Sequence, residues 1–210
     1  IIDACTFENN TVATDQVLLF ACANGKILNS NFTGNTAAEG TVTITGSNNL
    51  VDNCNFTKNT AYGAGALRSN QNVTISDSRF VANSAQTAAG AVLLASTGLI
   101  DGCRFENNTA DDGAAIYTEN EKVTVQGSEF IKNNATGNGA VYFASNQGVI
   151  ANSNFTNNQA LKGGAVYSTG KNVNITYSNF TQNHAGNEGG AVYLIGESSI
   201  ISFSDFINNT

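Results

Sequence analysis

Three observations in this 210-residue chain predict an all-β fold, a single-stranded right-handed parallel β-helix. One motif recurs every 24 to 26 residues: a β-branched aliphatic residue, Ser or Cys, Phe, and then Asn three residues after the Phe. Each unit holds three short apolar stretches separated by Asn, Gly and Ser, and no window has apolar residues at helical spacing. A fixed period of this length indicates stacked units. We therefore expect one domain over residues 1–210, with about eight full coils and three short strands per coil.

Two columns of the repeat define its interior. The phenylalanines are Phe7, Phe32, Phe56, Phe80, Phe105, Phe130, Phe155, Phe180 and Phe206. The asparagines are Asn10, Asn35, Asn59, Asn83, Asn108, Asn133, Asn158, Asn183 and Asn209. Equivalent residues stack on one another in parallel strands roughly 4.8 Å apart, and crossovers between parallel strands are right-handed. We expect a stack of rings and a ladder of amides, in which each Asn takes the left-handed turn conformation and bonds its own backbone and the neighbouring amides.

A third column follows the Gly-Ala pairs and contains Arg68, Leu93 and then four tyrosines, Tyr117, Tyr142, Tyr167 and Tyr193. Strand alternation points this column outward, because its neighbour in the sequence is always aliphatic. Four stacked tyrosines would form a binding strip suited to sugar rings or to a protein surface. The alternative is that the rings stabilise neighbouring strands by cross-strand stacking.

The four cysteines are expected to be free thiols. Cys5, Cys54 and Cys103 stand two residues before a repeat Phe, where other units have Ser, and they lie two coils apart. That separation of roughly 10 Å is too long for a disulfide. Cys22 lies elsewhere in the first unit. We expect buried thiols that act as small apolar fillers, with no disulfide and no metal site.

Catalytic and cofactor chemistry is not expected. The constant spacing leaves no room for the long loops that build a catalytic cleft, and Asp3, Asp52 and Asp101 share one column but lie on alternate coils. Asp111 and Asp112 form the acidic doublet, which favours a solvated turn over a Ca²⁺ site. His184 is the single histidine and follows the ladder Asn183, so we expect it to be a turn residue, and a Ser-His-Asp set would need another histidine. We expect no catalytic residues, no metal ligands and no cofactor.

Charge and hydropathy restrict the partners. The net charge of −7 argues against binding to a nucleic acid backbone. The sequence contains no apolar run long enough to cross a bilayer, so direct membrane insertion is not expected. Both ends lie inside the repeat without a visible cap, so we expect either that the native chain continues beyond these residues or that the open strand edges pair with other copies.

The whole chain resembles a known repeat family. The units combine Phe-x-x-Asn with Gly-Gly-Ala-Val, as in Phe155 to Asn158 with Gly163 to Val166 and Phe180 to Asn183 with Gly189 to Val192. The first two units depart from the Gly-Gly-Ala part. This pattern closely resembles the repeats of adhesin-like surface proteins of methanogenic archaea and of chlamydial polymorphic membrane proteins, and its Asn-Phe-Thr-rich style is closer to the archaeal group. The resemblance implies an extracellular, surface-displayed β-helix used in adhesion or envelope structure.

Sequons are consistent with an extracellular location. Asn31, Asn55, Asn154 and Asn179 precede an inward Phe, should face outward, and are the better candidates for glycosylation. Our leading hypothesis is a non-enzymatic adhesin-like module at the cell surface, whose partner is a host or partner-cell surface protein or glycan. The alternative is a structural protein whose copies pair through open ends or faces into a filament, tube or sheath. A polysaccharide-active β-helix enzyme ranks third.

Overall fold

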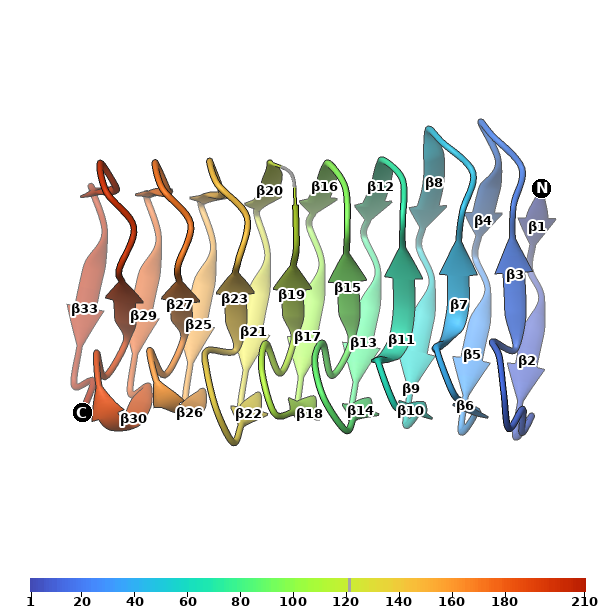
Figure 1. Ribbon diagram of the computed structural model, residues 1–210, viewed down its shortest axis with the longest axis horizontal. Coiled ribbons are helices and arrows are strands. Elements are labelled where there is room, and N and C mark those ends of the chain that lie inside the picture. Colours follow the sequence, from blue (N-terminus) through green and yellow to red (C-terminus); the bar gives the residue numbers. More distant parts are fainter. Residues whose placement is uncertain (121) are drawn as a thin grey trace.

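The computed structural model describes residues 1–120 and 122–210, and the chain forms a straight rod of stacked coils (Figure 1). Within these residues there are 33 strands in four parallel sheets and no helix that could cross a bilayer. Each strand pairs with its equivalents one coil before and one coil after it. The two termini therefore lie at opposite ends of the rod (Figure 1).

Sheet A carries the β-branched column that precedes Ser or Cys. Ile27, Val51, Ile75 and Ile100 point inward and are fully buried, because alternate residues of a strand face opposite sides. Its strands are β1 (Ile2–Asp3), β4 (Lys26–Leu28), β8 (Asn49–Asp52), β12 (Val73–Ser76), β16 (Gly98–Asp101), β20 (Val123–Gln126), β24 (Val149–Ala151), β28 (Asn174–Thr176) and β32 (Ile200–Ser202).

Sheet B carries the Phe column at the middle position of each strand, in the register Phe7↔Phe32 and Phe105↔Phe130. The first and third residues of each strand face solvent. Its strands are β2 (Thr6–Glu8), β5 (Asn31–Thr33), β9 (Asn55–Thr57), β13 (Arg79–Val81), β17 (Arg104–Glu106), β21 (Glu129–Ile131), β25 (Asn154–Thr156), β29 (Asn179–Thr181) and β33 (Asp205–Ile207).

Sheet D carries the aliphatic column that follows the Gly-Ala pairs. Val42, Leu67, Val92 and Ile116 are fully buried. Its strands are β3 (Leu18–Phe20), β7 (Gly40–Ile44), β11 (Ala64–Ser69), β15 (Val92–Leu94), β19 (Ile116–Thr118), β23 (Val141–Phe143), β27 (Val166–Ser168) and β31 (Val192–Leu194).

A fourth sheet, sheet C, differs from the three strands per coil that the sequence predicts. It forms after the ladder Asn, where a polar residue followed by an inward Ala is enough to pair with the next coil. Such short segments give no apolar run in the sequence. Its strands are β6 (Thr36–Ala37), β10 (Thr60–Ala61), β14 (Ser84–Ala85), β18 (Thr109–Ala110), β22 (Asn134–Ala135), β26 (Gln159–Lys162) and β30 (His184–Glu188).

The nine repeat phenylalanines form one continuous stack inside the rod. Adjacent ring centroids are 4.5–4.9 Å apart and adjacent ring planes differ by 1–10°. The rings from Phe32 to Phe180 are fully buried. Because the rings follow the spacing of the strands, the stack and the sheet hydrogen bonds fix the same register.

The repeat asparagines form a ladder beside the Phe stack. From Asn35 to Asn183, the side-chain Nδ2 of each ladder Asn donates to Oδ1 of the next Asn and to the backbone oxygen of the Phe in the preceding coil, as Asn108 does to Asn133 (2.9 Å) and Phe80 (2.9 Å). The backbone N–H of Asn83 also donates to Oδ1 of Asn108 (2.9 Å). The amide thus joins three successive coils.

The left-handed residue of this turn is not the ladder Asn, so that part of the sequence prediction is wrong. The residue before it has positive φ, for example Lys58 (55°), Ala82 (55°) and Gln182 (55°). The amide also bonds a Phe carbonyl of the preceding coil and not its own backbone. The ladder bonds fix this corner strongly enough to hold residues that have no preference for positive φ.

The cysteines are free thiols, but the buried ones contact backbone carbonyls and do not act only as small apolar fillers. Cys54 and Cys103 are buried, whereas Cys5 is half-buried and Cys22 is exposed, against expectation. The Sγ of Cys54 lies 3.2 Å from the carbonyl of Asp52, and Ser78 Oγ donates to the equivalent carbonyl of Ser76 (2.7 Å). These thiols therefore occupy the place of the hydroxyl in a Ser ladder and act as weak donors.

Candidate functional site

The predicted tyrosine strip lies on the outer side of sheet D, on β19, β23, β27 and β31. Tyr142 contacts Tyr117 and Tyr167 edge-on, with centroids 4.9 and 4.8 Å away and planes at 76° and 86°. Tyr167 and Tyr193 are stacked with centroids 5.7 Å apart. Tyr167 is only 8 % exposed and the other three are half-buried. The strip therefore packs across strands and offers little open ring surface.

The glycine-containing turns before sheet D lie close to the Cβ atoms of these tyrosines. A Cβ on Gly113 would lie 3.0 Å from Tyr117 Cβ, and one on Gly189 would lie 2.7 Å from Tyr193 Cβ. Both glycines have positive φ, so the segment can fold back against the ring column. Burial raises the pKa of the Tyr167 hydroxyl, which stays protonated at neutral pH.

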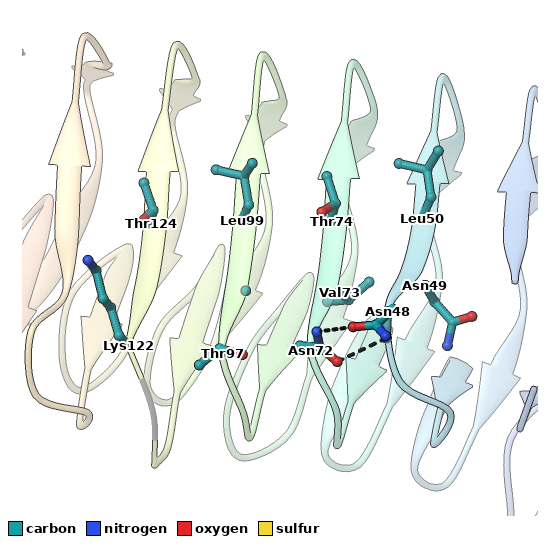
Figure 2. A pocket seen from close by; sticks show the side chains of 11 residues that line it. Asn48, Asn49, Leu50, Asn72, Val73, Thr74, Thr97, Leu99, Lys122 and Thr124 are labelled. Carbon is teal, nitrogen blue, oxygen red and sulfur yellow. Dashed lines mark hydrogen bonds between the residues drawn. The ribbon is translucent and has the colours of Figure 1, made fainter. Parts of the chain in front are cut away.

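A groove of about 510 Å³ runs along sheet A over four coils, from β8 to β20 (Figure 2). Leu50, Thr74, Leu99 and Thr124 form one row on neighbouring strands, and Lys122 stands at the C-terminal end of the opposite row (Figure 2). The amides of Asn48 and Asn72 bond each other at the N-terminal end, where Asn72 Nδ2 donates to Asn48 Oδ1 and Asn48 N donates to Asn72 Oδ1. One row of the groove thus alternates Leu and Thr, and the groove has a hydrogen-bonded amide pair at one end and an exposed lysine at the other.

A second groove, of about 520 Å³, runs along sheet B from β21 to β33. It lies between the two rows of outward residues. The row nearest to sheet A is polar throughout, and the other has two threonines between two isoleucines. The rows are Glu129, Asn154, Asn179 and Asp205, and Ile131, Thr156, Thr181 and Ile207.

Charged residues bound this groove on its N-terminal side. Arg104 donates from Nη2 to Glu106 Oε2 (3.0 Å) and from Nη1 to Glu129 Oε2 (2.5 Å). These partly exposed pairs add little stability in water. The ion pair with Arg104 holds Glu129 at the end of the groove. The charged residues also separate two patches of strands with the sequence Asn-Phe-Thr, one on β5 and β9 and one on β25 and β29.

The four candidate glycosylation sites face solvent in those two patches. Asn31, Asn55, Asn154 and Asn179 are all exposed. Asn55 Nδ2 donates to Asn31 Oδ1 (3.0 Å), and Asn179 Nδ2 donates to Asn154 Oδ1 (2.9 Å). A glycan on Nδ2 leaves one N–H for this bond, so the geometry is compatible with modification.

The remaining polar candidates are dispersed. Asp111 Oδ1 accepts from Thr136 Oγ1 (2.7 Å), and Asp112 Oδ1 accepts from the backbone N–H of Asn138 (2.9 Å). His184 Nδ1 lies 2.9 Å from Thr210 Oγ1. Across residues 1–120 and 122–210, no three His, Cys, Asp or Glu side chains come together in a metal-ligating group.

An exposed aromatic pair was missed by the sequence reasoning. Tyr177 and Phe203 lie at the corner between sheets A and B in consecutive coils, with ring centroids 4.9 Å apart and planes at 7°. They are 59 % and 75 % exposed. The sequence does contain a sign of this pair. The residue before the Ser/Cys column is Asn, Asp, Gly or Ala in the first seven units and is aromatic only in the last two.

Four continuous parallel sheets around one buried core define a parallel β-solenoid, the class that the repeat predicts. The family model described as right handed beta helix region matches residues 1–98 and 86–210, and the chain belongs to this family. The right-handed β-helix expected from the sequence is thereby confirmed. The search of curated proteins and the search of solved structures each gave no match.

Proposed function

We propose that this chain is a non-enzymatic, extracellular module of an adhesin-like surface protein, which attaches through the outer faces of its β-helix. The observation that carries the proposal is the pair of grooves on sheets A and B. Each crosses four coils, and every coil contributes side chains from the same positions of the repeat, which are amide, hydroxyl, aliphatic or charged groups. A repeating array of this kind suits a repeating ligand, such as a polymer or a densely covered surface.

The scaffold supports attachment because its outer rows are rigid. The Phe stack and the Asn ladder fix every coil to the next, so the outward side chains are held in register before any ligand arrives. A preorganised surface loses little conformational entropy on binding.

Two surface carboxylates are held in ion pairs, which suits binding better than acid catalysis. Glu129 is paired with Arg104, and Glu188 with Lys162 at 2.9 Å. The hydrogen bond from Lys162 keeps the pKa of Glu188 below its usual value, whereas a general acid in glycoside hydrolysis needs a raised one. The exposed sequons of the two Asn-Phe-Thr patches fit an extracellular location.

Retention under flow tests the proposal. The exposed thiol of Cys22 allows coupling of the chain to beads in one orientation. We expect these beads to be retained on cell or polysaccharide surfaces, with beads that carry denatured chain as the control. Retention no higher than that of the control would refute attachment.

The alternative of assembly into a filament, tube or sheath makes a different prediction. Electron micrographs of the concentrated soluble chain would then contain ordered polymers. Dispersed particles that still bind surfaces favour attachment, whereas ordered polymers without surface binding favour the structural alternative.

A further inference from the structure

The aromatic pair at the corner of sheets A and B adopts an unfavourable backbone conformation. Tyr177 and Phe203 both have φ of 50°, in the left-handed region that bulky residues avoid. The equivalent position in earlier coils is filled mainly by residues that tolerate this conformation, namely Asn29, Asn53, Asp77, Gly102, Gly127 and Asn152. Because aromatic residues are unfavourable at this left-handed position, their presence indicates that the two rings have a function.

Tyr177 is largely exposed although it is stacked on Phe203. Phe203 covers one face of the ring, and coils lie on both sides of Tyr177, yet 59 % of the residue remains exposed. The ring reaches beyond the shorter side chain of Asn152 in the preceding coil. Gly127 and Gly102 follow in the same column and have no side chain. The side chains of this column are therefore shorter in the coils that precede Tyr177.

Polar groups lie next to the rings. Asn179 stands two residues after Tyr177 and Asp205 two residues after Phe203, and both line the groove on sheet B. The row nearest to the rings continues through Asn154 to Glu129. It offers amide donors and acceptors beside carboxylate acceptors.

We propose that this corner and the adjoining groove bind a neutral pyranose oligosaccharide. The proposal rests on the attachment function above and names its ligand. A pyranose has an apolar C–H face that packs on an aromatic ring and hydroxyl groups that bond amides and carboxylates, so both halves of the site are used. The carboxylates of Glu129 and Asp205 and the net charge of −7 disfavour a polyanionic glycan.

The test measures affinity for defined oligosaccharides by isothermal titration calorimetry. The probes are cello-, malto- and manno-oligosaccharides, with hyaluronan oligosaccharides as the anionic comparison. The chain is produced in a bacterial cytosol so that Asn154 and Asn179 carry no glycan. The double variant Tyr177→Asn, Phe203→Gly introduces residue types found in this column, and the melting temperature checks its fold.

We expect one neutral oligosaccharide to bind and the double variant to bind it about tenfold more weakly, with the melting temperature retained. The matched control is Tyr62→Ser, because Tyr62 is 60 % exposed but lies in the turn after β10, away from the groove. This control should bind like the parent.

Three outcomes overturn the inference. Unchanged affinity in the double variant would mean that the rings are not the site. An equal loss in Tyr62→Ser would indicate non-specific adsorption. If no neutral oligosaccharide binds while beads are still retained in the flow assay, the attachment function stands and the ligand is of another class, such as a protein.

Discussion

At the scale of single residues, the buried side-chain amides of the ladder from Asn35 to Asn183 each bond several partners. Asn108 accepts from the backbone and side chain of Asn83 and donates to Asn133 and Phe80. Each of these partners lies inside the rod, where water cannot replace a lost bond. An unpaired buried polar group costs about 1–3 kcal/mol.

Asn108→Ala should therefore lower the free energy of unfolding by about 3 kcal/mol or more. Chemical denaturation followed by circular dichroism measures the change. Asn55→Ala is the matched control, because Asn55 is exposed and bonds one amide on the surface. The free energy of unfolding of Asn55→Ala should fall by only about 0.5 kcal/mol. Equal losses for the two variants would show that the ladder does not stabilise the fold.

The buried thiol of Cys103 predicts a dependence of stability on pH. Burial raises the pKa of this thiol from 9.0 to about 12. The unfolded chain therefore ionises first, and the contribution of Cys103 is fully present below pH 9 and declines as the pH rises toward 12. Between pH 9 and 11 the parent should lose stability relative to Cys103→Ser, with a slope that steepens toward about 1.4 kcal/mol per pH unit. A constant difference between the two proteins over this range would contradict the assigned burial.

At the scale of elements, the Gly-Ala segments let the chain cross from sheet C to sheet D against the neighbouring coil. A Cβ on Gly164 would lie 2.4 Å from the carbonyl oxygen of Gly190 and 2.5 Å from that of His184. These are backbone atoms, which cannot move without shifting the next coil. The repeated glycine therefore reflects close packing of coils.

Gly164→Ala should destabilise the chain by roughly 1–3 kcal/mol because the added methyl group overpacks this contact. Gly186→Ala is the control, since its nearest neighbour would be Leu161 Cδ1 at an ordinary 3.5 Å. The unfolding free energy of that variant should change by less than about 0.5 kcal/mol. The interpretation fails if both substitutions are neutral.

The Phe stack makes its own prediction for sheet B. Phe105 is buried between Phe80 and Phe130, with centroids 4.9 Å away on each side. Phe105→Ala should cost about 3–5 kcal/mol, through lost burial and a cavity that the fixed coils cannot close. Thermal unfolding of the variant measures this cost, and a melting temperature equal to that of the parent would contradict it.

At the scale of the whole molecule, the interior was predictable and the surface was less so. Phe and Asn columns at constant period require parallel stacking, and Phe105 and Asn108 occupy the expected places. The exposure of Tyr167 depends on the path of a glycine segment that no periodicity reveals. The corner at Tyr177 was overlooked because Tyr177 departs from the residue type of its column, whereas the repeat is recognised from residues that the units share.

The central claim is that the chain attaches through its outer faces without cleaving what it binds. Size-exclusion chromatography of a neutral polysaccharide, after prolonged incubation with an excess of the chain, tests this claim most directly. We expect the polysaccharide to co-elute with the protein in a saturable complex and to keep its size distribution when released. A progressive shift toward shorter chains would contradict the claim and identify an enzyme.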